Sequence, residues 1–266
     1  MTPRVTLRSA GDTHVGRVRD HNEDAYLRRD DAGLWAVADG MGGHHKGEVA
    51  SAAVVDALAG LPEAAEPRAR LTAVQEALEA VHDRLVAAST REGVSGTTAV
   101  VLLASDDHVA AVWAGDSRVY RWRGGRLDQL SRDHSLVQEM VDQGQISPQE
   151  ARRHPWRNRV TSAIGAGGAW RHEVVGDRVE PGDRYLLCSD GLTECLDDAA
   201  IAATLADDAP DAAVQRLIAQ TLDAGAPDNV TVVVVVAEPA SPPAATGDEP
   251  ADLEAPTRVP GDHRRA

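Results

Sequence analysis

The residues best suited to chemistry are five aspartates that lie at the ends of apolar segments or in tight turns. They are Asp24, Asp39, Asp116, Asp190 and Asp228. A carboxylate that emerges where a buried strand ends can be aimed into a shared pocket, and hard cations such as Mg²⁺ and Mn²⁺ prefer oxygen ligands. The pattern therefore indicates a divalent-cation site built from residues far apart in the chain.

Glycine directly follows two of these aspartates, in Asp39-Gly40 and Asp190-Gly191. Glycine lets the backbone approach a ligand or turn with positive φ, and its carbonyl can join a coordination shell. The run from Gly40 to His44 is rich in glycine and suits a loop that lies against a ligand. Each position taken alone is also explained by an ordinary turn, because Asp-Gly and Asp-Asn pairs form turns readily. The combination favours the cation site.

Charge and composition fit a metal site and argue against other classes of partner. The 266 residues include 42 acidic and 27 basic side chains, and the net charge of −15 disfavours nucleic acid and anionic lipid. The two cysteines, Cys188 and Cys195, form no zinc-type cluster. The N-terminus has no apolar stretch of signal-peptide length, and no window approaches 18 consecutive apolar residues. We therefore expect a cytoplasmic protein without membrane insertion.

The length and a change in composition divide the chain into two parts. A single core can grow to roughly 250 residues, so we expect one large domain over residues 5–237. After Glu238 the sequence turns to Ala, Pro, Gly, Asp and Glu, which bury too little apolar surface to offset chain entropy. Residues 238–266 are therefore predicted to be a disordered Pro/Ala/acidic tail.

Hydrophobic periodicity predicts the elements that must position the aspartates. Short β-rich runs predict strands at Leu34–Ala38, Thr97–Ala104, His108–Ala114, Arg118–Trp122, Tyr185–Ser189 and Val230–Ala237. Apolar residues at three-to-four spacing predict helices at Glu48–Leu58, Arg68–Ala88, Ser135–Gln143, Pro148–His154, Asp198–Ala206 and Asp211–Ala224.

The order of these elements predicts an α+β fold. Helices come in adjacent pairs, and Val109–Trp113 is predicted to form a hairpin with Val119–Arg121 through Gly115-Asp116. Separate strand-rich and helix-rich blocks indicate a β-sandwich or a large sheet covered by helices, and not a regular βαβ alternation.

Six short stretches rich in Asp, Gly and Thr follow one another along the chain: Gly16–Ala25, Val37–His44, Ser95–Ala99, Gly115–Arg118, Cys188–Leu192 and Asp228–Thr231. In this order they resemble the motif set of bacterial type 2C metal-dependent (PPM) serine/threonine protein phosphatases. The resemblance is collinear over nearly all of residues 10–237, and six ordered motifs make coincidence improbable where one would be weak evidence. It implies a four-layer α-β-β-α sandwich, with two antiparallel sheets flanked by helix pairs and a Mn²⁺/Mg²⁺ pair at one end.

The resemblance also implies roles for single residues. Asp39 resembles the carboxylate that bridges both metals, and Gly40 resembles the residue whose carbonyl binds one of them. Asp190 and Asp228 resemble ligands of the other metal. Asp24 resembles a residue that holds metal-bound water, as does Glu23.

Two further positions complete the implied site. Asp116 resembles the ligand of a third, weaker metal site, and Arg19 resembles the arginine that grips the substrate phosphate. Arginine suits that role because its paired N–H donors match two phosphate oxygens. From its chemistry alone, a surface salt bridge with a neighbouring acid explains Arg19 equally well.

The implied activity is hydrolysis of phosphoserine and phosphothreonine monoesters by a metal-activated water, without a covalent phosphoenzyme. The implied partners are phosphorylated proteins, including a Ser/Thr kinase, and the implied state is a monomer. Eukaryotic relatives carry a histidine after the Asp-Gly pair, where this chain has Met41; His44 and His45 follow shortly after, so the general acid is open.

Other interpretations remain beside this one. Residues 131–164 resemble a flap next to the metal site, and their Asp133-His134-Ser135 run could imitate a hydrolase triad, although adjacent residues cannot form the relay. A catalytically silent relative, or an enzyme dedicated to one phosphoserine regulator, would carry the same motifs. A Ca²⁺-binding protein would show a twelve-residue acidic loop, which the sequence lacks.

Overall fold

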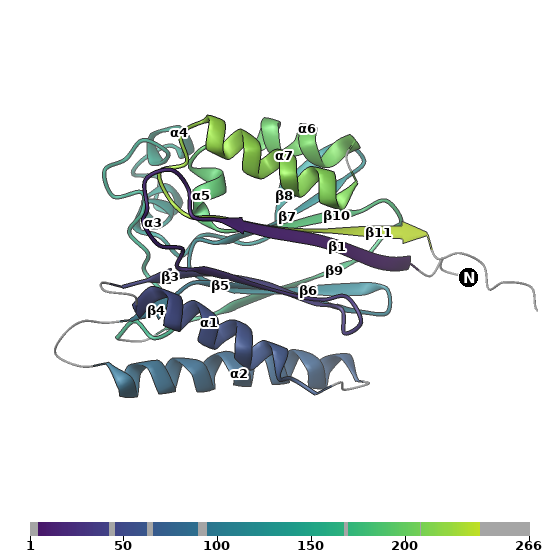
Figure 1. Ribbon diagram of the computed structural model, residues 1–266, viewed down its shortest axis with the longest axis horizontal. Helices are drawn as coiled ribbons and strands as arrows, with labels where there is room; N and C mark the ends of the chain where they lie inside the picture. The colour runs from purple at the N-terminus through teal and green to yellow at the C-terminus, as the bar shows by residue number, and fades with distance from the viewer. Residues whose placement is uncertain are drawn as a thin grey trace, which may run out of the picture.

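The computed structural model describes residues 5–42, 46–62, 66–89, 95–167, 170–207 and 209–239. Two antiparallel sheets lie face to face, and helices cover the outer face of each (Figure 1). The predicted four-layer α-β-β-α architecture is confirmed. The last strand continues through Glu238 and Pro239, and the rest of the predicted tail lies outside the described residues.

The first sheet has the strand order β1, β11, β10, β7, β8. These strands are β1 (Val5–His14), β11 (Val230–Pro239), β10 (Arg184–Cys188), β7 (Arg118–Arg123) and β8 (Arg126–Gln129). Its outer face is covered by α6 (Asp198–Asp207) and α7 (Pro210–Asp223), with the short α5 (Asp190–Thr193) at one end.

The second sheet has the order β2, β3, β5, β6, β9, and β4 pairs with β3 beside this path. Its strands are β2 (Asp24–Arg29), β3 (Leu34–Met41), β4 (Gly96–Thr97), β5 (Ala99–Ser105), β6 (His108–Ala114) and β9 (Glu173–Arg178). The outer face is covered by α1 (Lys46–Ala59) and α2 (Pro67–Ala88). The remaining helices, α3 (Leu136–Asp142) and α4 (Pro148–Ala151), lie at the same end as α5 (Figure 1).

The valine run of β11 shows why its sequence does not alternate with polar residues. Val232, Val234 and Val236 pack toward α6 and α7, whereas Val233 and Val235 pack between the sheets. A strand covered on both faces must be apolar on both, so it reads as a continuous hydrophobic run.

Alternation along β3 directs one aspartate toward the centre of the sandwich. Leu34, Ala36 and Ala38 belong to the core beneath α1 and α2, while Trp35 and Val37 belong to the core between the sheets. Because side chains alternate along a strand, Asp39 falls on the inter-sheet side where the strand ends.

All the predicted strands and helices are present, although α4 ends at Ala151, before the predicted His154. The strands that the pattern missed are β1, β2, β8 and β9, which are the edge strands of the two sheets. Edge strands carry polar side chains such as Arg28 and Arg29, so their apolar signal is weak.

The predicted hairpin through Gly115-Asp116 is wrong. Strand β6 pairs with β5 and β9, whereas β7 pairs with β10 and β8, so the two strands lie in different sheets. Two β-rich runs joined by a Gly-Asp turn look the same whether the chain folds back or crosses to the facing sheet. Partners distant in sequence decide between them.

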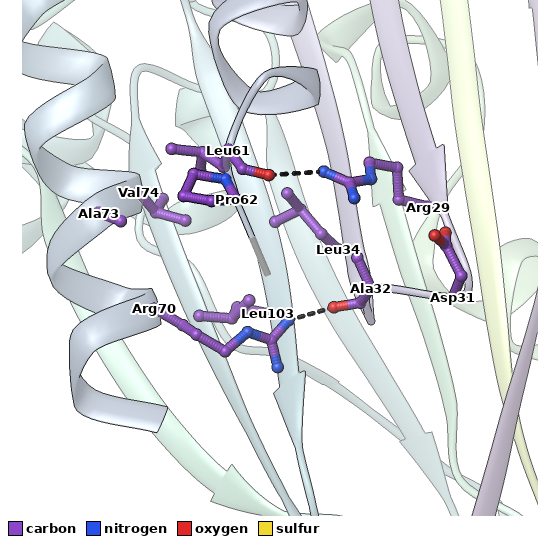
Figure 2. A pocket seen from close by; sticks show the side chains of 10 residues that line it. All are labelled: Arg29, Asp31, Ala32, Leu34, Leu61, Pro62, Arg70, Ala73, Val74 and Leu103. Carbon is purple, nitrogen blue, oxygen red and sulfur yellow. Dashed lines mark hydrogen bonds between the residues drawn. The ribbon is translucent and has the colours of Figure 1, made fainter. Parts of the chain in front are cut away.

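A cavity of about 170 Å³ lies at the end of the sandwich opposite Asp39, between the β2–β3 turn and the start of α2 (Figure 2). Nη1 of Arg29 donates to the carbonyls of Ala59 and Leu61 at 3.1 and 3.0 Å. Arg70 donates to the carbonyls of Ala104, at 2.6 Å, and Ala32. Both arginines thus donate to backbone carbonyls, so the residues around this cavity form a structural junction between the sheet and the helices.

Replacing Arg70 with Ala should therefore destabilise the fold, because it leaves shielded carbonyls without donors. We expect a loss of about 1–3 kcal/mol, a fall in melting temperature of roughly 2–10 °C. The exposed Arg68→Ala on the same helix is the control and should melt like wild type. Equal melting of both variants in a thermal denaturation experiment would contradict this role.

Candidate metal centre

All five predicted aspartates lie at one end of the sandwich. Asp24 and Asp39 are cross-strand partners on β2 and β3. Asp190 begins α5 and is separated by one residue from the end of β10, Asp228 precedes β11, and Asp116 lies in the crossing between β6 and β7. The negative charges of the other four each raise the pKa of Asp39, after its burial as the largest cause. The structure thus brings the predicted carboxylates together.

Several carboxylate oxygens in this cluster are buried without a hydrogen-bond partner among the described residues. They are Oδ1 of Asp24, Oδ1 of Asp190 and Oε1 of Glu194, the last of which has only a longer ion pair with Arg157 Nε at 3.5 Å. The other oxygen of Asp24 accepts from Ser189 Oγ at 2.8 Å and Thr231 Oγ1 at 2.7 Å. A buried carboxylate oxygen without a donor is costly, and a hard divalent cation would satisfy it. The donor set therefore fits Mg²⁺ or Mn²⁺.

The electrostatics of the cluster favour neutralisation. Burial, opposed by hydrogen bonds from Thr231 and Ser189, raises the pKa of Asp24 to about 6. Burial and the charge of Asp133 raise the pKa of Asp116 to about 7. The pKa of Asp190 lies well above its ordinary value, first through burial and then through its acidic neighbours. Protons or cations must compensate charges held this close.

Among the described residues, no three or more Asp, Glu, His or Cys side chains are arranged so that they could hold a metal ion. Like-charged carboxylates repel, and Asp228 turns its Oδ2 toward Arg19 Nη2 at 2.6 Å. Small side-chain rotations gather carboxylates once a cation offsets their repulsion, so the orphaned oxygens fit a cation site although the side chains are not arranged around one.

Two glycines allow backbone segments to meet at the cluster. A Cβ on Gly191 would lie 1.9 Å from the carbonyl oxygen of Asn229, so only glycine lets α5 press against the start of β11. A Cβ on Gly40 would lie 2.2 Å from the carbonyl oxygen of Gly47. These contacts hold Asp190 near Asp228 and Asp39 near the start of α1.

Sequence reasoning assigned no role to Asn229, which organises the loop that carries Arg19. Its Nδ2 donates to the carbonyls of Val15 and His21, both at 2.9 Å, and its Oδ1 accepts from the Glu23 backbone N–H at 2.9 Å. The residue is buried, so these bonds are shielded from water. In the sequence, the signal that could have revealed this role is the position of Asn229 within the Asp228–Thr231 motif.

The threonine pair Thr97-Thr98 likewise lacked a predicted role and fixes Asp39. Thr97 Oγ1 and the Thr98 backbone N–H both donate to the carbonyl of Asp39 at 2.9 Å. The backbone N–H of Asp39 donates to Thr98 Oγ1 at 3.0 Å, and that hydroxyl lies 2.7 Å from Ser117 Oγ. The backbone of Asp39 is therefore fixed by Thr97 and Thr98, and through Thr98 it is linked to the crossing between β6 and β7.

Arg19 lines an open cleft of about 410 Å³ together with Glu23, Gly42 and Asn229. Its side chain is 53% exposed, and its contact with Asp228 is the surface ion pair that its chemistry allowed. Its role in phosphate binding stays a prediction. Met41 pairs with Gly96 at the end of β3, while His44 and His45 lie outside the described residues.

Asp116 faces a second cavity, of about 480 Å³, which the flap segment (residues 131–164) closes from the other side. The ends of the segment are pinned, because Thr161 N–H donates to the carbonyl of His134 at 2.7 Å. The backbone N–H of His134 donates to the carbonyl of Gly115 at 2.9 Å, and the backbone N–H of Gly115 donates to Nδ1 of His134 at 3.3 Å. His134 thus positions the neighbour of Asp116 and does not form a relay with Ser135.

The chain matches the family model described as Protein phosphatase 2C over residues 10–230. It is 41% identical over 238 residues to the serine/threonine protein phosphatase PstP of Mycobacterium tuberculosis, covering 87% of this chain and 45% of that protein. The chain thus spans about half the length of the first curated relatives it matches.

Solved structures give the same picture. One is PppA, described as a key regulatory component of T6SS in Pseudomonas aeruginosa, with TM-score 0.81 and 41% identity over 88% of this chain and 99% of that one. Another is the catalytic domain of PstP in complex with two manganese ions, with TM-score 0.77 and 37% identity over 88% of this chain and 99% of that one.

A test of the centre needs no substrate. In chelator, the raised carboxyl pKa values make the folded state bind more protons than the unfolded state between about pH 4 and pH 7, so these groups cost stability as pH rises. The free energy of unfolding of Asp39→Asn should therefore exceed that of wild type by about 1–3 kcal/mol at pH 7.5, and by less at pH 5.

The matched control is Asp31→Asn in the exposed turn at the other end of the β2–β3 ribbon. Added Mn²⁺ should raise the melting temperature of wild type and of Asp31→Asn more than that of Asp39→Asn. An Asp39→Asn protein that is destabilised equally at both pH values would contradict the charge cluster.

Proposed function

The chain belongs to the protein phosphatase 2C family, and from this premise we propose that it is a metal-dependent phosphatase acting on phosphoserine and phosphothreonine in proteins. The observation that carries the proposal is the set of buried carboxylate oxygens without donors, beside a cleft lined by an arginine. Such a set suits two divalent cations and a phosphate dianion together.

We assign Asp39, Gly40, Asp190 and Asp228 as ligands of the cation pair, Asp24 as an outer ligand, and Asp116 as the ligand of a third, weaker cation. Support comes from the two manganese ions in the similar PstP structure and from the convergence of these residues here. When bound, Mn²⁺ or Mg²⁺ supplies Lewis-acid activation of water and neutralises phosphate charge.

The chain's own residues bind and orient the substrate. Arg19 sits on a loop that Asn229 fixes, and its half-exposed guanidinium can present paired N–H donors to two phosphate oxygens. Its ion pair with Asp228 keeps it at the mouth of the site. Met41 offers no proton, so the residue after Asp39-Gly40 does not serve as general acid.

Further parts of the proposal follow from the chemistry of the substrate. A phosphoserine or phosphothreonine must be formed by a Ser/Thr kinase, so the proposed partners include a kinase or its products. The proposed location is the cytoplasm, where ATP is available to such a kinase. Among the described residues, no helix is long and apolar enough to cross a bilayer. All the assigned residues lie between Arg19 and Asp228, so one copy of the domain supplies the whole proposed site, and we propose a monomer.

Turnover tests the proposal directly. Phosphate release from an aryl phosphate and from a phosphothreonine peptide should require Mn²⁺ or Mg²⁺ and stop in chelator. Asp39→Asn should lower kcat by about a thousandfold, since cation activation contributes several kcal/mol. Asp31→Asn is again the matched control. Folded wild-type protein that releases no phosphate with either metal would overturn the assignment and favour a silent phosphoprotein binder.

Arg19 makes a separate prediction about binding. Arg19→Ala should raise KM for the phosphopeptide by roughly ten- to a hundredfold, because it removes charged hydrogen bonds to the phosphate. Arg19→Lys should restore little of this, since lysine lacks the paired donors. Arg8→Ala, an exposed arginine on β1, is the control. If KM stays unchanged in Arg19→Ala, the arginine only pairs with Asp228.

A further inference from the structure

The second half of the flap segment concentrates positive charge in an acidic protein. Residues 152–159 contain four arginines and no acidic residue, although the whole chain carries a net charge of −15. We call Arg152, Arg153, Arg157 and Arg159, together with Trp156, the basic flap surface. Its charge is opposite in sign to that of the molecule as a whole.

The surface is ordered and faces solvent. It begins at the C-cap of α4, and the carbonyl of Arg159 accepts from the Leu136 backbone N–H at 2.9 Å, which ties it to α3. All four arginines are exposed, and Trp156 is 46% exposed. Arginine and tryptophan are enriched where proteins bind partners.

The same segment forms a wall of the cavity beside the metal centre. Arg152 and Arg157 line the cavity of about 480 Å³ that also contains Asp116 and Asp190. Nε of Arg157 lies 3.5 Å from Oε1 of Glu194, at the end of α5. Figure 1 places α3, α4 and α5 at one end of the molecule. A chain bound at the centre can therefore extend across the basic flap surface.

Ion pairs within the fold engage the positive charge of these arginines only weakly. Arg152 pairs with Asp198 at 3.6 Å, where both side chains are more than half exposed, and such pairs contribute little stability. Arg159 lies over the Trp156 ring at 6.0 Å. Within the described part of the chain, no ion pair is found for Arg153 or Arg159. These guanidinium groups keep donors for an external anion.

We propose that the basic flap surface binds an acidic segment of the phosphoprotein substrate, next to the phosphorylated residue. The anionic groups are carboxylates of Asp or Glu, or a second phosphate, and they meet the arginines while the phosphothreonine occupies the metal centre. This inference rests on the proposed function and names the substrate class for that site. The chain as a whole is acidic, so its charge favours binding of an anionic segment at this surface over the rest of the molecule.

The test compares three phosphothreonine peptides that differ only in the residues flanking the phosphothreonine: three glutamates, a phosphoserine, or three glutamines. At low salt, wild type should show kcat/KM about three- to tenfold higher for both anionic peptides than for the glutamine peptide. In R153Q/R159Q the ratio should fall toward one. The ratio within each protein cancels general effects on turnover.

The matched control is R68Q/R84Q, which removes two exposed arginines from α2 and should keep the wild-type ratio. Binding of fluorescein-labelled peptides, followed by anisotropy in chelator, gives a readout independent of catalysis and should show the same order. If wild type prefers only the phosphoserine peptide, the surface binds a second phosphate. If it prefers both the phosphoserine and the glutamate peptides, the surface binds negative charge in general.

Two results would overturn the proposal. One is equal kcat/KM and equal binding for all three peptides with wild type at low salt. The other is a preference that survives in R153Q/R159Q. If no peptide is turned over but the anionic ones still bind in an arginine-dependent way, the proposed function fails while the docking surface stands.

Discussion

The structure depends on holding several carboxylates of like charge together, away from water, at one end of two packed sheets. Asp39 illustrates the cost, because burial and four neighbouring acids raise its pKa well above the ordinary value. Orphaned oxygens on Asp24 and Asp190 add to that cost. Such an arrangement is unfavourable on its own, and binding of a divalent cation would offset its free-energy cost.

The remaining architecture acts as a rigid support for this charge cluster. Three apolar layers fill the space between helices and sheets, and the arginines Arg29 and Arg70 close the opposite end with backbone hydrogen bonds. Near the cluster, Asn229 and Thr98 satisfy backbone groups of the loops that carry the acids. Rigid elements hold the chemistry, and the flap segment adds an outer surface of opposite charge where recognition can differ between substrates.

The sequence predicted the central strands, the helices and the five aspartates, because buried strands and helical periodicity leave strong local signals. It missed the edge strands, whose polar side chains weaken the pattern, and it paired β6 with β7 although they lie in different sheets. Glu194 and Asn229 were missed because their roles arise from contacts distant in sequence, such as Asn229 with Val15. The motif order predicted which acids converge, while only the fold reveals which contacts hold them together.

Anomalous diffraction from a crystal soaked in Mn²⁺ tests the central claim most directly. The account predicts two strong manganese peaks against the carboxylate of Asp39, with Asp190 and Asp228 turned toward them and Arg19 still at the mouth of the site. Peaks confined to surface carboxylates, or no peak at the cluster at millimolar Mn²⁺, would contradict the claim that these buried aspartates form a divalent-cation centre.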